Sequence, residues 1–186
     1  SASVSFIGGL VESALAKGKF VAECFDKDGN LKWRDEFTNT VMTAGKNLAL
    51  DTILAGSSYT VTGPYLGLIS SASYSAISAS DTMASHAGWL EAGTTNAPQW
   101  TTPGSGARAT AAFSSASGGS KALSSALSFS ISTTGTLKGC FLVFGSSASA
   151  TNLNTSGTLL SAGLFSGGDR AVINGDTVNV SYSLAL

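Results

Sequence analysis

Residues 136–145 read Thr-Leu-Lys-Gly-Cys-Phe-Leu-Val-Phe-Gly and form the densest apolar run in the chain. Aromatic and branched residues favour extended backbone, and turn residues flank the run on both sides. In a strand, Phe141 and Val143 point to one face of the sheet, and Leu142 and Phe144 point to the other. Because neither face tolerates water, the run predicts a central strand with neighbours on both sides and a second layer packed against it.

Other segments have the composition of strands and are separated by Gly, Ser and Asn turns. The clearest pair is an early hairpin, Lys19 to Phe25 and Leu31 to Phe37, joined by a tight turn at Asp26 to Asn30. The remaining extended segments are Pro64 to Ile69, Arg108 to Phe113, Ala122 to Ile131, Gly157 to Phe165 and Asp176 to Leu184. About eight or nine strands in one chain indicate an all-β antiparallel β-sandwich, with a jelly roll as the expected version.

One helix is predicted within this β sequence, from Thr43 to Ala55, with Thr43 as its cap and Gly56 at its end. Four apolar residues give this helix an apolar side; they are Leu48, Leu50, Ile53 and Leu54. Between the strands, Ser70 to Ser80 is expected to be a loop and Thr94 to Gly106 an irregular excursion. No linker divides the chain, so residues 18–186 are expected to form a single domain.

The composition of the 186 residues limits the classes of partner. Charged residues make up 11% of the chain and the formal net charge is −1, against about 25% charged residues in an average soluble domain. Neither nucleic acid nor a membrane surface is therefore expected as a partner. A weakly charged surface protects poorly against self-association, which suits a protein that works in an assembly.

The two cysteines, Cys24 and Cys140, lie in predicted strands far apart in the sequence. We expect buried, reduced thiols, with a disulfide between neighbouring strands as the alternative, because two cysteines are too few for a disulfide-dependent scaffold. The protein is thus interpreted as made in a cytosol.

Residues 1–17 form an apolar N-terminal arm. Phe6, Leu10, Val11 and Leu15 are spaced for one helical face, although Gly8 and its neighbour weaken a helix there. Ordering such an arm costs about as much free energy as burying its side chains on one domain returns. We therefore expect the arm to lie against another chain, with Phe6, Leu10 and Val11 as assembly contacts; packing on its own domain is the alternative.

The sequence contains no recognisable constellation of catalytic residues. His86 is the only histidine and has no nucleophile elbow, so a structural histidine whose ring bonds a nearby backbone group is expected. Metal-ligand spacings and phosphate loops are also absent. We therefore predict a protein that is not an enzyme and that uses no cofactor and no metal.

Two sets of residues keep alternatives open. Five acidic residues have no spacing typical of a glycosidase pair but could converge in the fold; they are Asp35, Glu36, Asp51, Glu91 and Asp176. Trp89 and Trp100 look exposed and are candidate assembly contacts, although aromatic residues of this kind also close the end of a sandwich or stack on sugars.

Several short motifs resemble a widespread family of tailed-bacteriophage virion proteins. The resemblance covers about residues 18–186, and its most distinctive block is Asp81-Thr-Met-Ala-Ser-His86 followed by Gly88-Trp89-x-Glu91. After this block the family often carries an Arg-Pro pair, where this chain has Arg108-Ala109. The other matching motifs are Gly45-Lys-Asn-Leu-Ala-Leu50, Tyr65-Leu-Gly-Leu-Ile69, Gly139-Cys-Phe-Leu-Val143, Gly157-Thr-Leu-Leu-Ser161 and Gly175-Asp-Thr-Val-Asn-Val180.

Some members of this family resemble capsid decoration, or cement, proteins, which are jelly rolls that clamp capsomers from outside. The resemblance implies a structural virion protein on the outer capsid surface, with the major capsid protein and further copies of itself, as a dimer or trimer, for partners. The alternative is a receptor- or carbohydrate-binding β-domain of a phage tail fibre or tip.

Overall fold

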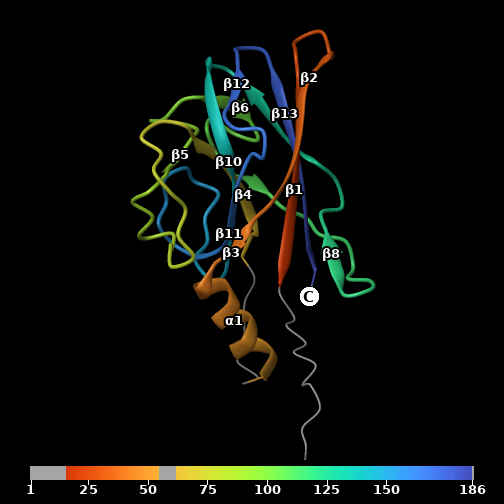
Figure 1. Cartoon of the computed structure of the whole chain (residues 1–186), viewed down its shortest axis with the longest axis vertical. Coiled ribbons are helices and arrows are strands. Elements are labelled where there is room, and N and C mark those ends of the chain that lie inside the picture. The colour runs from red at the N-terminus through yellow and green to blue at the C-terminus, as the bar shows by residue number, and fades with distance from the viewer. Residues whose placement is uncertain (1–15, 55–61, 186) are drawn as a thin grey trace, which may run out of the picture.

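The computed structural model describes residues 16–54 and 62–185, which fold into two antiparallel β-sheets and one helix. Figure 1 shows the long strands running along the molecule, with α1 (Thr43–Leu54) projecting from one end. The all-β sandwich expected from the sequence is confirmed. The jelly-roll connectivity is not confirmed. Two hairpins each keep both of their strands in a single sheet: β1–β2 lies in the first sheet and β10–β11 in the second.

The first sheet is built around β1 and β13, which pair along nine residues each. Its strand order is β2-β1-β13-β9-β6, and β8 also pairs with β13. The strands are β1 (Lys17–Phe25), β2 (Leu31–Thr38), β6 (Trp100–Thr102), β8 (Ser120–Ala122), β9 (Leu127–Ile131) and β13 (Thr177–Ala185).

The second sheet is built around β10, the strand that contains the apolar run. Its order is β3-β11-β10-β4-β5, with β12 paired to β10 and β7 paired to β4. The strands are β3 (Thr40–Val41), β4 (Tyr65–Ser70), β5 (Leu90–Glu91), β7 (Ala109–Thr110), β10 (Gly135–Phe144), β11 (Thr158–Leu164) and β12 (Arg170–Val172). The central position of β10, with neighbours on both sides, is confirmed.

Both faces of β10 are covered, as its sequence requires. Cys140 and Leu142 belong to the core between the sheets, whereas Phe141 and Val143 belong to a second cluster on the other face. That second cluster includes Met83 and Trp89, from the irregular segment between β4 and β5, and part of it therefore lies under a layer that has little regular structure.

Two predicted strands differ from the structure. The segment from Ala122 to Ile131 is interrupted between β8 and β9: Leu123 still donates to Tyr182 of β13, but the next residue, Ser124, donates to Ala112 and leaves the ladder. The segment from Arg108 to Phe113 shrinks to the two residues of β7, because the backbone N–H of Arg108 donates to Ala150.

The early hairpin and the helix start are confirmed. The turn is closed by hydrogen bonds from the backbone N–H of Asp26 to Asn30 and from Gly29 to Asp26. Helix α1 begins at Thr43 as expected. No helix in the described part of the chain is long and apolar enough to cross a membrane.

Candidate functional site

The exposed apolar surface of α1 is the most unusual feature of the described surface. Leu50, Ile53 and Leu54 expose 54%, 70% and 78% of their area. Their spacing of three and four residues places them on one side of the helix. Within α1 only Gly45 is buried. Of the apolar side predicted from the sequence, Leu48 is half-buried, and the other three residues are not covered by the described part of the chain.

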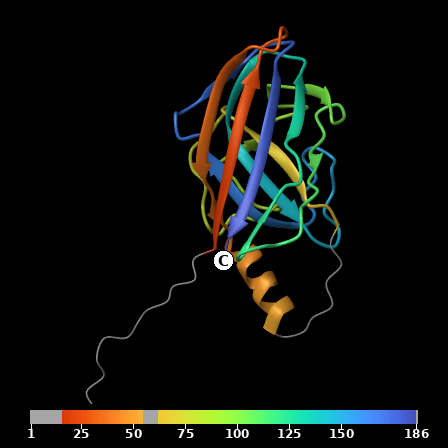
Figure 2. The same cartoon turned by 90° about the vertical axis from the view of Figure 1, so that its right-hand side faces the viewer.

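Helix α1 is attached to the sandwich only near its first turn. The backbone N–H of Met42 donates to the carbonyl of Leu160 at 2.9 Å. A Cβ atom at Gly45 would lie 3.0 to 3.1 Å from Leu160, so glycine lets the helix approach β11 closely. The apolar C-terminal half of α1 therefore extends away from the sandwich, as Figure 2 shows from a second direction.

An apolar pocket of about 560 Å³ opens between the two sheets. Leu142 and Leu160 line it from the second sheet, and Tyr182 and Leu184 line it from the first. The hydroxyl of Tyr182 accepts a hydrogen bond from the Asn39 amide at 3.2 Å, and burial raises its pKa.

The mouth of this pocket lies at the end of the molecule that carries α1. Pro64, just before β4, and Leu184, near the end of β13, both contribute to the lining. In Figures 1 and 2 the C-terminal end of β13 lies close to the base of α1. Lys121 is the only charged residue among the described lining residues of this pocket.

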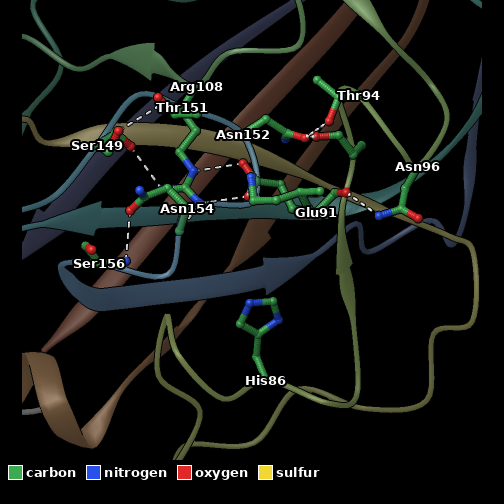
Figure 3. Close-up of polar contacts among 12 residues, drawn as sticks. His86, Glu91, Thr94, Asn96, Arg108, Ser149, Thr151, Asn152, Asn154 and Ser156 are labelled. Carbon is green, nitrogen blue, oxygen red and sulfur yellow. Dashed lines mark hydrogen bonds and ion pairs between the residues drawn. The ribbon is translucent and has the colours of Figure 1, made fainter.

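A buried ion pair organises the loops on the far side of the second sheet (Figure 3). Arg108 donates from Nε to Oε1 of Glu91 at 2.8 Å and from Nη2 to Oε2 at 2.7 Å. The same guanidinium donates to the backbone carbonyls of Ser149 and Asn154, and Glu91 accepts from the backbone N–H of Leu153. Every polar atom of this pair is used in joining chain segments, which is a structural role.

His86 has the structural role expected from the sequence. Its Nδ1 lies 3.1 Å from the carbonyl of Trp89, and its ring stacks on the indole at 3.9 Å between centroids. In Figure 3 the imidazole lies apart from the Arg108–Glu91 network. The prediction that the ring bonds a nearby backbone group is confirmed.

The expectation that Trp89 and Trp100 are exposed is wrong. Trp89 is fully buried and Trp100 exposes 1% of its area. Their indole N–H groups donate to Asp81 at 2.9 Å and to the carbonyl of Ala107 at 2.8 Å. Neither ring offers a face to a sugar or to a partner, because the irregular segments fold over both indoles.

The acidic residues do not converge. Asp35 binds Arg170 and the turn at Ser166, Glu91 binds Arg108, and Asp176 binds Lys32 at 2.5 Å. Among the described residues, no group of three or more His, Cys, Asp or Glu side chains is placed to hold a metal ion.

Both cysteines are free and buried, so the expectation of reduced thiols is confirmed for this structure. Burial and the neighbouring Asp176 carboxylate raise the pKa of Cys24 to about 12. Burial also raises the pKa of Cys140. Both thiols are therefore poor nucleophiles in the folded protein.

Phe6, Leu10 and Val11, the other expected assembly contacts, lie outside the described residues. Comparisons with family models, with curated proteins and with solved structures find no match to this chain.

Proposed function

We propose that this chain is a structural protein of a tailed-bacteriophage virion that decorates the outer capsid surface and stabilises it by clamping neighbouring capsomers. The motif resemblance motivates this proposal. The observation that carries it is the exposed apolar surface of α1, which projects from one end of the sandwich.

A rigid sandwich with a protruding apolar helix is suited to docking. Amphipathic helices bind partner grooves through residues spaced by three and four positions, as Leu50, Ile53 and Leu54 are. Charge contributes little to such a contact: Lys46 and Asp51 are the only charged residues of α1. The partners proposed are the major capsid protein and further copies of this chain.

Symmetry strengthens contacts that are individually weak. A capsid offers the same surface many times, so a protein that bridges two capsomers gains avidity without a large single interface. The low charge of the chain also avoids repulsion between closely spaced copies.

The burial of both tryptophans favours this role over the carbohydrate-binding alternative. Sugar-binding sites commonly present an aromatic ring face to the ligand, and neither Trp89 nor Trp100 does so. The buried carboxylates, for their part, are bound in ion pairs that join chain segments.

The first test compares two sets of apolar substitutions. The triple variant Leu50→Ser, Ile53→Ser, Leu54→Ser should bind phage heads that lack the protein at least about 100-fold more weakly, because each apolar anchor at a contact is worth more than about 1 kcal/mol. The matched control is Leu31→Ser with Ile173→Ser, which are also exposed but lie at the opposite end, near the β1–β2 turn. Equal binding by the two variants would contradict the proposal.

Location on the particle provides a second readout of the same proposal. The protein should be found in many symmetry-related copies on the head of intact virions, by electron cryomicroscopy and quantitative mass spectrometry. A few copies confined to the tail would instead support the fibre or tip alternative.

A further inference from the structure

The inter-sheet pocket is large for the interior of a sandwich. Protein cores are packed as densely as organic crystals, and most of their voids are smaller than a water molecule. A pocket of about 560 Å³, lined mainly by apolar side chains such as Phe113, Leu142, Leu160 and Leu184, has the size and character of a binding site.

The described chain begins beside this pocket. In the β1–β13 ladder Gly18 pairs with Leu184, which lines the pocket, and Lys17 pairs with Ala185. The residues that precede β1 therefore leave the sandwich at the mouth of the pocket. Fifteen extended residues span up to about 50 Å, enough to reach a neighbouring molecule.

The sequence of this N-terminal segment is complementary to the pocket. Phe6, Ile7, Leu10 and Val11 are apolar, and Glu12 is the only charged residue among residues 1–15. Lys121 is the only charged residue of the pocket lining, and no carboxylate of the described residues forms an ion pair with it.

We propose that the pocket receives the N-terminal segment of a second copy of this chain, with Phe6 to Val11 among the apolar side chains and Glu12 beside Lys121. Two copies exchange their segments around a two-fold axis at the α1 ends of the sandwiches. This inference rests on the proposed function, because it names the self-contact through which the decorating copies associate.

Docking of the segment on a second copy would cover more exposed apolar surface than docking on its own sandwich. Docking within one chain would fill the pocket but leave Leu50, Ile53 and Leu54 of α1 exposed. Two molecules that meet at their α1 ends bring these side chains into the same contact as the exchanged segments. The contact between the two α1 surfaces adds buried area beyond what the segment buries in the pocket, and this area helps to offset the entropy of ordering the segment.

A charge swap tests the pairing of Glu12 with Lys121. Lys121→Glu alone and Glu12→Lys alone should each raise the dimer dissociation constant about 5- to 10-fold, measured by sedimentation equilibrium. The double variant should return it to within about twofold of the unchanged protein, because the pair is restored with reversed signs. Lys121 is exposed, so its replacement leaves the core intact. A double variant no better than the single ones, or an unchanged protein that stays monomeric, overturns the inference.

Cysteine cross-linking shows which copy supplies the segment. A mixture of the Val11→Cys protein and the Leu184→Cys protein should form a disulfide-linked heterodimer under mild oxidation. The unchanged protein is the control, because its two cysteines are fully buried. A Val11→Cys, Leu184→Cys double variant that closes only within single chains would overturn the exchange.

Head binding, measured with the same variants, separates this inference from the proposed function. If the cross-link and the charge swap fail while the protein still binds heads, the exchange is wrong and the decoration role stands. If dimers form by exchange but neither the unchanged protein nor any variant binds heads, the decoration role is wrong and the exchange stands.

Discussion

At the scale of single residues, each buried charge is bound to a partner from a distant part of the chain. Glu91 and Arg108 join β5 to the segment before β7, and Asp35 joins β2 to the turn between β11 and β12. Such pairs stabilise little compared with apolar contacts of equal volume, but removing one member leaves an uncompensated charge in the interior. They define which loops pack together.

Replacing Arg108 is expected to be the costliest single change among the ion pairs. Arg108→Ala leaves Glu91 buried without a counter-charge and should lower the free energy of unfolding by about 3–5 kcal/mol, measured by urea denaturation. Lys19→Ala, which breaks the exposed pair with Glu36, is the control and should cost less than about 1 kcal/mol.

A variant that removes both charges, Arg108→Met with Glu91→Leu, should recover part of that loss, because no orphaned charge remains. If Arg108→Ala costs no more than Lys19→Ala, the buried pair does not hold these chain segments together.

The carboxyl of Asp35 makes stability depend on pH. Burial alone would raise its pKa, but hydrogen bonds from Ser166, Arg170 and Gly167 lower it from 3.8 to about 2. Because the folded pKa is the lower one, the carboxylate stabilises the fold above about pH 4, and this contribution is lost as pH falls towards 2. The shift corresponds to roughly 2 kcal/mol.

Asp35→Asn should therefore be less stable than the unchanged protein at pH 5, with the two free energies of unfolding converging as pH approaches 2. Denaturant titrations at several pH values measure this difference. A difference that stays constant from pH 5 to pH 2 would contradict the assigned role of the ionised carboxylate.

At the scale of elements, β10 depends on glycine where its neighbours come closest. A Cβ atom at Gly139 would lie 1.9 Å from the carbonyl oxygen of Gly163 on β11, which is backbone and cannot move aside alone. The register of β10 also shifts between Leu137 and Gly139 against β4, and between Leu142 and Val143 against β11. The central strand is therefore locally irregular despite its regular apolar pattern.

Gly139→Ala is expected to separate β10 from β11 and to lower the free energy of unfolding by roughly 3 kcal/mol, at the upper end for overpacked sites. Gly104→Ala is the matched control, since a Cβ atom there meets only the methyl group of Ala107 at 3.3 Å. Chemical denaturation measures both. Equal stability of the two variants would show that β11 can shift to accept the added methyl group.

At the scale of the whole molecule, the two ends of the sandwich differ in character. The end that holds the β1–β2 turn is closed by the ion pair of Lys32 with Asp176. The opposite end holds the apolar pocket and α1, on which Leu50, Ile53 and Leu54 are exposed. An assembly that contacts this protein through its α1 end would cover the apolar surface of α1 and the mouth of the pocket, and would leave the end with the β1–β2 turn outside.

The sequence by itself determined the class of the fold. Alternating and continuous apolar runs predict strands because side-chain direction in a strand depends only on local backbone geometry, and the apolar run at 136–145 required cover on both faces. Tight turns and helix starts are also local, so the Asp26 to Asn30 turn and the beginning of α1 at Thr43 could be predicted. The structural role of His86 could be predicted because the sequence offers no nucleophile elbow to accompany this single histidine.

The tertiary structure decided what is buried. Trp89 and Trp100 were expected at the surface, yet irregular segments fold over the indoles and accept hydrogen bonds from their N–H groups. The interrupted strand at 122–131, the Glu91–Arg108 pair and the apolar pocket likewise depend on segments far apart in the chain. Local patterns carry the preference of each residue for a strand or a turn, whereas burial depends on which distant segment packs above it.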